Sequence, residues 1–349
     1  MRERVYSLDV LRVFAMFMVL LNHTFAEEIT NTSATGIHMV LAIGSMIVSR
    51  TGVPIFLMLS GALHLKKSEI IDCKSLYLKR IPKVLIPFVV WSLIYFVIYD
   101  VIRDHNATVH SLTALIFLPG KAGHLWYMYL ILALYIFLPV FQGIVKSLNK
   151  SNIEYLLIIW ILASGVLHYL KELSVPGIRD FYANLHLLKG LWGYYLLGWY
   201  LSAYRPKINK GIIFFGIMAL YASLYVALYL YIRTKAEFCS EIISYSGLPI
   251  ILISAGIFIL IESCETLGKC AKVKNIVVFL SCISFGVYLN QFIARGIAGN
   301  IVSRFIGDGI ISLLMLFIFT SIISIVMSAI VYMLPNTWVG KKVKLFLGS

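Results

Sequence analysis

The sequence predicts an all-α integral membrane protein, a bundle of about ten transmembrane helices with both termini in the cytoplasm. Hydrophobic residues make up 60% of the 349, and the mean hydropathy is +0.89. A soluble domain is only about half apolar, so most of this chain must lie in lipid. Windows of about twenty apolar residues, each long enough to cross a bilayer, fall at 7–25, 38–65, 82–102, 124–145, 153–170, 186–204, 211–232, 247–264, 275–297 and 310–334.

Basic residues gather at alternate connections between these windows. They follow the second, fourth, sixth and eighth windows and the last one: Lys66, Lys67, Lys74, Lys79 and Arg80, then Lys146 and Lys150, then Arg205, Lys207 and Lys210, then Lys269, Lys272 and Lys274, then Lys341, Lys342 and Lys344. The other connections carry mixed pairs, such as Lys171 with Glu172 and Arg233 with Glu237. Because cytoplasmic loops are enriched in Lys and Arg, this pattern predicts that both termini are cytoplasmic.

The whole chain, 1–349, is expected to form a single transmembrane domain, because no loop between the windows is long enough to fold alone. The sequence contains no phosphate-binding loop, dinucleotide fingerprint, HExxH motif or CxxC pair, and we expect no metal site. The net charge of +14 lies mainly in short loops, so it reports membrane orientation rather than nucleic-acid binding. Any chemistry must therefore come from helix ends and intramembrane side chains.

The first window places three ionisable residues on one helix face. Eleven positions separate Arg12 from His23, a rotation of about 1100°, or three turns plus roughly 20°. Asp9 returns to within about 40° of the same face. Ionisable groups in lipid are costly and usually line an internal cavity, which makes these residues candidates for catalysis. A rise of about 21 Å between Asp9 and His23 excludes direct contact, and His23 is expected about 16 Å further from the cytoplasm than Arg12.

The second window carries Arg50 near mid-membrane, where an unpaired cation is costly. We expect Gly52 and Pro54 to loosen the helix there and to free backbone carbonyls. Arg50 is therefore a further candidate for the site, with pairing to a buried acid as the alternative. Ser60 and Gly61 fit close helix packing better than a nucleophile, because no base stands beside Ser60 in the sequence.

A series of phrases connects the chain to a known family: SLDVLRVFAMFMVLLNHT, GVPIFLMLSGALHL, YLKRIPKVLIPFVVW, HLWYMYLILALYIFLP and SFGVYLNQF. In wording and order, over nearly the whole chain, they resemble the membrane acyltransferase 3 family. The family hallmark of a basic residue followed by His in the first helix is matched by Arg12 and His23. The basic pair before the third helix is matched by Arg80 and by Lys83, which replaces a second Arg.

The resemblance implies an enzyme that moves an acyl group from cytosolic acyl-CoA to a hydroxyl of an envelope saccharide or lipid-linked glycan. We expect acetyl-CoA as the donor, no tightly bound cofactor, and the bacterial plasma (inner) membrane as the location. The HLWYMY phrase is closest to the short, domain-only branch of polysaccharide O-acetyltransferases. The acyl chain, the acceptor and the oligomeric state stay open.

O-acyl transfer needs a base, a group that neutralises the developing oxyanion, and anchors for the donor phosphates. We assign the base to His23 and the polarising of the thioester to Arg50. Asp9 can set the His23 tautomer only through a kink or a water chain. The expected phosphate anchors are Arg12, Lys79, Arg80 and Lys83, and the candidate acceptor contacts are His124, Trp126, Tyr129 and Asn290. Many family members carry His where this chain has Asn290 or Gln291. Direct attack and an acyl-histidine intermediate both remain open.

Structural interpretations compete with these assignments. Arg12 and His23 can form an interhelical pair, Arg80 and Lys83 can serve only as cytoplasmic signals, and the aromatic residues beside His124 can form an interfacial belt. We expect most of the remaining histidines to be solvated: His64, His105, His110, His168 and His186.

Two other functions compete with acyl transfer. A transporter or flippase for an envelope glycan or lipid-linked sugar would also need buried charges in a helical bundle. The membrane part of a sensor or racemase-like resistance protein fits less well, because such proteins fuse a similar domain to a soluble one.

Overall fold

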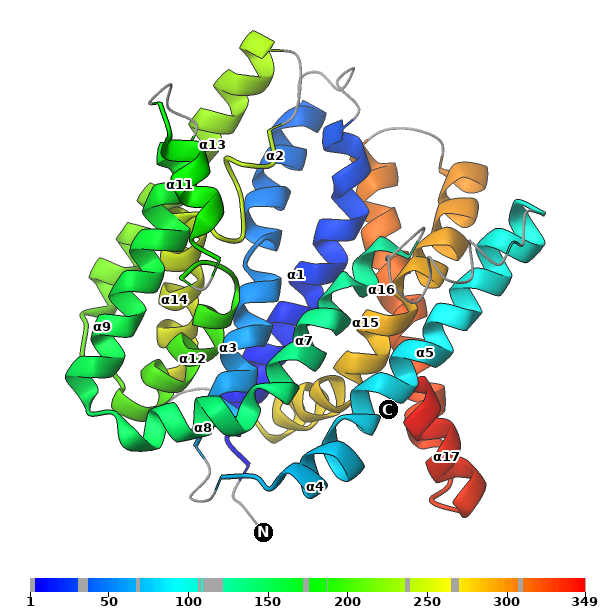
Figure 1. Ribbon diagram of the computed structural model, residues 1–349. Helices are drawn as coiled ribbons and strands as arrows, with labels where there is room; N and C mark the ends of the chain where they lie inside the picture. The colour runs from blue at the N-terminus through cyan, green and yellow to red at the C-terminus, as the bar shows by residue number, and fades with distance from the viewer. Residues whose placement is uncertain are drawn as a thin grey trace.

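The computed structural model describes residues 4–30, 37–66, 70–105, 108, 122–171, 176–186, 188–235, 239–264, 270–306 and 310–348. The described part of the protein is all-helical, with 84% of the described residues in helices and no strand. The all-α prediction is therefore confirmed. The first described residues and the last helix lie at the same end of the bundle, the lower end in Figure 1.

The first half of the chain forms α1 (Tyr6–Thr30), α2 (Ile37–Ser49), α3 (Gly52–His64), α4 (Cys73–Ser75), η1 (Leu76–Arg80), α5 (Pro82–Phe96), η2 (Val97–Arg103), η3 (Gly123–Leu125), α7 (Trp126–Ile136), α8 (Leu138–Ser147), α9 (Lys150–Trp160), η4 (Ile161–Val166) and α10 (Leu167–Leu170). The second half forms α11 (Ile178–Asn184), α12 (Trp192–Tyr204), α13 (Lys210–Lys235), α14 (Leu248–Glu262), α15 (Ala271–Phe305), α16 (Ile310–Met333) and α17 (Trp338–Leu347).

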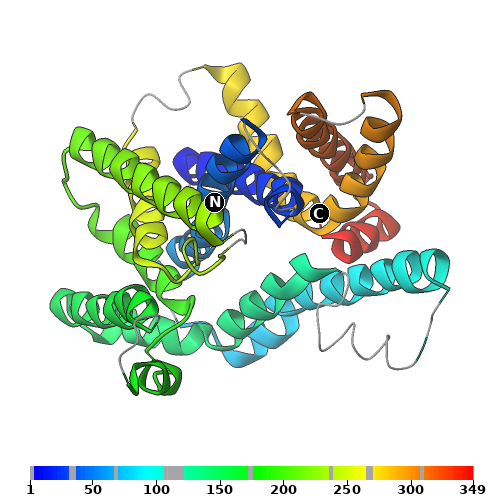
Figure 2. The ribbon, with the colours of Figure 1, turned by 90° about the horizontal axis from the view of Figure 1, so that it is seen from above.

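Helix α1 is the central helix of the bundle. It contacts α2, α3, α14, α15 and α16, and Leu11 and Ala15 on it are fully buried. Seen from above, α1 to α3 lie between α12–α14 on one side and α15 and α16 on the other (Figure 2). This central position explains how α1 carries three ionisable residues in lipid, because neighbouring helices shield them.

Seven helical segments of the described chain are long and apolar enough to cross a membrane, or eight if the bent pair α7–α8 forms one span. The bend between those two helices is 53°. Two more expected windows, 186–204 and 247–264, form the shorter helices α12 and α14. The backbone before α12 is not helical because side chains bind it: Trp160 Nε1 donates to the Gly190 carbonyl and Ser164 Oγ accepts from its N–H. The count of ten spans and the cytoplasmic orientation of the termini stay predictions.

The second expected window breaks at Arg50 and Thr51, between α2 and α3. Pro54 has no N–H to donate to the Arg50 carbonyl, so the helical hydrogen-bond pattern is interrupted there. Gly52 lets α3 approach α1 closely, since a Cβ at this position would lie 3.1 Å from the Ala15 carbonyl oxygen. The loosening expected from Gly52 and Pro54 is thus present.

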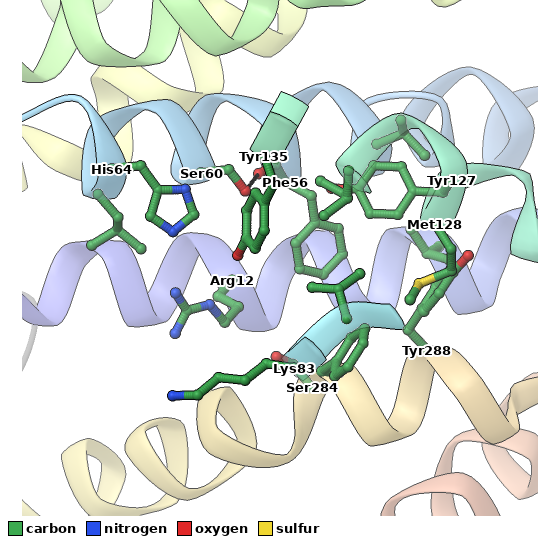
Figure 3. A pocket seen from close by; sticks show the side chains of 16 residues that line it. Arg12, Phe56, Ser60, His64, Lys83, Tyr127, Met128, Tyr135, Ser284 and Tyr288 are labelled. Atoms are coloured by element: carbon green, nitrogen blue, oxygen red, sulfur yellow. Dashed lines mark hydrogen bonds between the residues drawn. The ribbon is translucent and has the colours of Figure 1, made fainter. Parts of the chain in front are cut away.

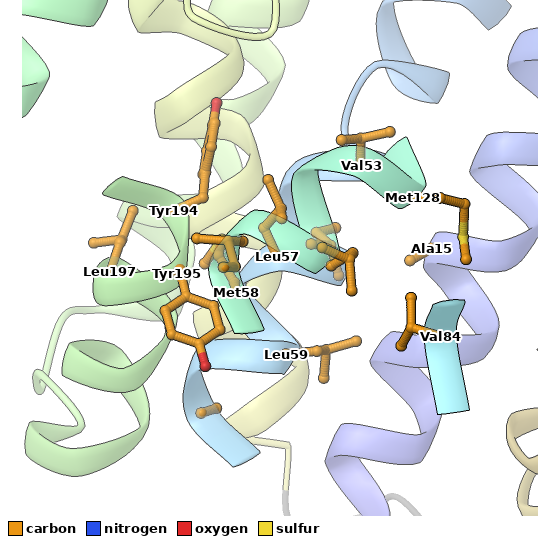
Figure 4. Close-up of a cluster of buried hydrophobic side chains, with 14 of the residues drawn as sticks. Ala15, Val53, Leu57, Met58, Leu59, Val84, Met128, Tyr194, Tyr195 and Leu197 are labelled. Atoms are coloured by element: carbon orange, nitrogen blue, oxygen red, sulfur yellow. The ribbon is translucent and has the colours of Figure 1, made fainter. Parts of the chain in front are cut away.

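Helices α3 and α12 cross at backbone contact distance. A Cβ at Gly61 would lie 1.7 Å from the Tyr195 carbonyl oxygen, and a Cβ at Gly198 would lie 2.0 Å from that of Met58. The packing interpretation of Gly61 is confirmed. Figure 4 shows Met58, Tyr195 and their apolar neighbours in the cluster that fills the space around this crossing. The two glycines thus fix the position of α3, which lines the cavity described next.

Candidate active site

A cavity of about 320 Å³ follows α1 from Arg12 to Val19 (Figure 3). Helices α1, α3, α5, α7 and α15 contribute its walls. The polar side chains that line it are Arg12, Ser60, His64, Lys83, Tyr127, Tyr135, Ser284 and Tyr288. The described residues that line it include two cations and no carboxylate, so it favours a polar or anionic ligand over a cationic one.

Arg12 is held at the lower end of this cavity by hydrogen bonds. Its guanidinium donates to Ser281 Oγ at 3.0 Å, and Ser281 Oγ donates to Asp9 Oδ1 at 2.6 Å. Asp9 is 4% exposed and also accepts from Arg4 at 2.6 Å. Asp9 therefore belongs with Arg12 rather than with His23, and it fixes the guanidinium that faces the cavity.

His64 on α3 also lines the cavity, opposite Arg12 in Figure 3. Its ring lies 5.2 Å from the ring of Tyr135, and its Nδ1 is buried without a hydrogen-bond partner among the described residues. The positive charges of Arg80 and Arg12 interact electrostatically with the His64 imidazole. The expectation that His64 is solvated is therefore wrong, because its ring faces the cavity and its Nδ1 is buried.

The other histidines that we expected to be solvated differ in exposure. His105 and His186 are exposed, as expected, and His110 lies outside the described residues. His168 is only 3% exposed, so the expectation fails for it. Its Nε2 lies 3.2 Å from Glu241 Oε2, and its Nδ1 lies 3.5 Å from the Tyr182 hydroxyl. A polar loop encloses His168, and its position near a window end did not reveal that enclosure.

The expected phosphate anchors lie on the segment that enters α5. Asp72 begins this segment by accepting from the Ser75 N–H at 2.8 Å, which lowers the pKa of the Asp72 carboxyl. Lys83 lines the cavity. Arg80 is close enough to His64 and Tyr135 to interact with them electrostatically. Lys79 is exposed on the same turn and is not one of the residues that line the cavity.

His23 meets His124 beyond the upper end of the cavity. The centroids of the two rings are 6.1 Å apart, and Phe292 lies 5.1 Å from His23 and 4.1 Å from His124. His124 Nε2 lies 3.4 Å from the Leu289 carbonyl oxygen. Its Nδ1 is buried and has no hydrogen-bond partner in the described part of the chain. The pair thus offers at least one buried imidazole nitrogen, His124 Nδ1, that no described protein group occupies.

The cavity ends close to the histidine pair. Val19 lines the cavity, and His23 follows one helical turn later on α1. Tyr288 lines the cavity from α15, and its hydroxyl donates to the His124 carbonyl. A ligand extending upward from Arg12 would therefore end beside the two imidazoles.

Arg50 lies at the same end, at the break between α2 and α3. It acts electrostatically on His23, together with Arg295 on α15. The Arg50 guanidinium lies 4.9 Å above the ring of Tyr245, which is 5.9 Å from the ring of Trp126. The buried Nε of Arg50 has no hydrogen-bond partner among the described residues. Tyr245 thus lies between Arg50 and Trp126 and contacts both of them near His23.

The sequence was also compared with known protein families. Residues 5–333, nearly the whole chain, match a family model described as an acyltransferase domain. The chain belongs to the membrane acyltransferase 3 family. Searches of curated proteins and of solved structures found no match. The protein is therefore a multi-pass membrane acyltransferase.

None of the four expected acceptor contacts lines the cavity itself, and two of them, Tyr129 and Asn290, pack against other helices. Tyr129 packs on Phe88 of α5, with ring centroids 4.9 Å apart, because it lies on another face of α7 than Tyr127. Asn290 bonds to Ser324 and Ser328 on α16 and is 2% exposed. Both residues thus connect helices in this structure.

Other residues reach the site without having been singled out in the sequence. Gln291 has a buried Oε1 with no partner in the described residues, next to Phe292. Arg295 is an ionisable residue inside an apolar window, a signal that would have identified it. Tyr245 had no sequence signal, because it comes from a loop that folds back on Arg50. No group of described His, Cys, Asp and Glu side chains could hold a metal ion.

Proposed function

We propose that this acyltransferase moves an acetyl group from cytosolic acetyl-CoA to a hydroxyl of an envelope saccharide in the bacterial plasma membrane. The cavity between Arg12 and the His23–His124 pair carries this proposal. It has a cationic entrance and a pair of imidazoles beyond its far end. An acyl-CoA is polyanionic at one end and carries its thioester at the other. Its phosphates would therefore meet the cationic entrance, and its thioester would lie near the imidazoles.

In this proposal Arg12, Arg80 and Lys83 anchor phosphate oxygens of the donor, and Lys79 adds positive charge at the entrance. Asp9 is a positioning residue, because it holds Ser281 and Arg12. The thioester arm lies along α1, so that its carbonyl comes beside His23. The acceptor enters from the opposite side, between His124, Trp126 and Tyr245. Acyl transfer then crosses the membrane without passage of the cofactor.

His23 acts as the base. It takes the proton of the acceptor hydroxyl as the oxygen attacks the thioester carbonyl, and the carbon–sulfur bond breaks to release the CoA thiolate. The same proton then passes to the thiolate, which leaves as CoA. Arg50 stabilises the oxyanion that forms in between. If the acyl group first moves to His23, the imidazole is the nucleophile and the hydroxyl attacks the acyl-histidine.

Acyl transfer in membrane vesicles tests the proposal. Vesicles containing the protein receive radiolabelled acetyl-CoA and a crude envelope glycan fraction, and label in the glycan is counted. His23→Ala is compared with His186→Ala, a matched loss of an exposed histidine. We expect transfer with the wild type and with His186→Ala, and a loss of roughly 10²-fold or more with His23→Ala at the same membrane level.

Equal label with His23→Ala and with the wild type would remove His23 from the chemistry. A transporter needs no thioester. Glycan export that continues without acyl-CoA, with no label incorporated, would favour the transporter or flippase alternative.

A further inference from the structure

A larger cavity of about 720 Å³ adjoins the active-site cavity at its lower end. Arg12 and Leu63 line both of them. A third cavity, of about 370 Å³, shares Arg205 and Glu262 with the second. The three cavities thus follow one another from the surface between α12 and α13 to Val19, one helical turn before His23.

The second and third cavities form a basic groove. Six cationic side chains line them, Arg4, Arg12, Lys66, Arg205, Lys207 and Lys210, against two carboxylates, Asp9 and Glu262. Asp9 is already bound by Arg4 and Ser281. Glu262 accepts from Ser202 Oγ at 2.8 Å and lies 3.9 Å from Arg205. The excess positive charge of the groove is therefore not neutralised by the described residues that line it.

Arg205 marks the point where the two outer cavities meet. It follows α12 in the left-handed region, with φ at 43° and ψ at 69°. Side chains with a Cβ disfavour this conformation, and glycine is the usual residue after a helix that ends this way. An arginine held there, with its side chain 66% exposed in the groove, suggests a contribution from the guanidinium itself.

The positive-inside rule accounts for basic loops at this end of the bundle. It does not require that their side chains line cavities that continue into the active site. The second cavity, at about 720 Å³, also has a larger volume than the inner cavity, at about 320 Å³, so the groove suits the bulkier part of a long ligand.

Resting on the acyl-CoA donor proposed above, we propose that the basic groove binds the nucleotide end of the donor, a 3′-phosphorylated nucleoside diphosphate. Its 3′-phosphate matches the cations of the groove, and its diphosphate reaches the inner end of the groove at Arg12, where Lys83 and Arg80 meet it. Arg205 and Arg4 present planar guanidinium groups that suit phosphate oxygens, and Lys66, Lys207 and Lys210 add point charges. Only the thin arm that carries the thioester then enters the cavity beyond Arg12.

Equilibrium binding to the purified full chain in lipid nanodiscs tests this proposal. Isothermal titration calorimetry is run with CoA and with dephospho-CoA, which lacks the 3′-phosphate. The double variant Lys66→Gln/Arg205→Gln is compared with Lys146→Gln, an exposed lysine on α8 outside the groove. Lys66→Arg/Arg205→Lys retains the charges and controls for folding.

We expect the wild type to bind CoA more tightly than dephospho-CoA. The double Gln variant should lose roughly tenfold or more in CoA affinity, and its preference for CoA should shrink. Lys146→Gln should bind as the wild type does, and the charge-retaining variant should recover most of the affinity.

Unchanged CoA binding in the double Gln variant would overturn the groove while leaving the proposed function intact. An equal loss in Lys146→Gln would also overturn it, by tracing the effect to overall charge. If the wild type binds neither ligand, the acyl-CoA donor itself is wrong, and the groove proposal falls with it.

Discussion

The two ends of the α1 cavity are built in opposite ways. At the lower end, Arg12 bonds to Ser281, Ser281 bonds to Asp9, and Asp9 bonds to Arg4. At the upper end, His124 Nδ1 and Arg50 Nε are buried with no hydrogen-bond partner among the described residues. Arg12 and Asp9 at the lower end are paired within the protein, although His64 Nδ1 there has no partner among the described residues, whereas the upper end leaves atoms of both candidate groups, His124 and Arg50, without a partner.

This difference separates binding from chemistry. A guanidinium fixed by a buried carboxylate is preorganised to hold an anion at one position. Buried polar atoms without partners cost stability, and they persist at sites where a substrate completes their hydrogen bonds. The lower end is therefore suited to hold a donor, and the upper end is suited to act on it.

The largest expected effect comes from a change that damages both ends at once. Gly61→Ala adds a Cβ 1.7 Å from the Tyr195 carbonyl oxygen, so α3 and α12 must separate. We expect loss of monodisperse protein in detergent, because backbone cannot yield as a flexible side chain can. Gly299→Ala on α15 is the matched control, since a Cβ there meets nothing within 4 Å. Normal gel-filtration behaviour of Gly61→Ala would contradict the crossing.

A change confined to the lower end should affect donor binding alone. Asp9→Asn removes the carboxylate that holds Ser281 and Arg4. We expect the KM for acetyl-CoA to rise roughly tenfold at nearly unchanged kcat, the cost of a lost charged hydrogen bond. Initial rates at varied acetyl-CoA measure this, with Ser281→Ala as a milder variant. A fall in kcat at constant KM would place Asp9 in the chemistry instead.

A change at the upper end that spares His23 should affect the acceptor. Tyr245→Leu removes the ring between Arg50 and Trp126. We expect the KM for the glycan to rise about fivefold, within the range of a cation–π contact. Tyr245→Phe retains the ring and should behave as the wild type. If both variants show the same loss, the hydroxyl matters and the ring interpretation is wrong.

The smallest expected effect concerns the loop that carries Tyr245. Lys171 donates to Glu241 at 2.8 Å and lowers the pKa of the Glu241 carboxyl. A lowered pKa stabilises the folded state above the ordinary carboxyl pKa of about 4.3, and the gain disappears as the pH falls through the lowered value. We expect Glu241→Gln to melt slightly below the wild type at pH 7, with the difference shrinking below about pH 4. A constant difference across that range would contradict the ion pair.

Helical periodicity predicted the residues that α1 presents to the site, but not those of α3, where Ser60 and His64 line the cavity. Arg12 and His23 lie on one face of α1, and the cavity follows that face, because a single helix sets their relation. The break at Arg50 was also predictable, since Pro54 lacks an N–H. These features depend on neighbours in the sequence.

Contacts between distant segments were not predictable. Tyr245 reaches Arg50 only because its loop folds back over the bundle, and Asp9 pairs with Ser281 from the far end of the chain. Asn290 and Tyr129 were chosen from motif positions, yet each packs between helices. The apolar window 186–204 is as long as a full span, yet only its last 13 residues form the helix α12. Hydropathy does not distinguish a helix from an apolar turn that precedes it.

The most direct test of the division between binding and chemistry compares Arg12→Gln with His23→Gln in one vesicle assay, with acetyl-CoA varied at saturating acceptor. Arg12→Gln should raise the KM for acetyl-CoA roughly tenfold at nearly constant kcat. His23→Gln should lower kcat by about 10² to 10⁴ at nearly constant KM. A fall in kcat with Arg12→Gln, together with only a raised KM for His23→Gln, would contradict the assignment of the two ends.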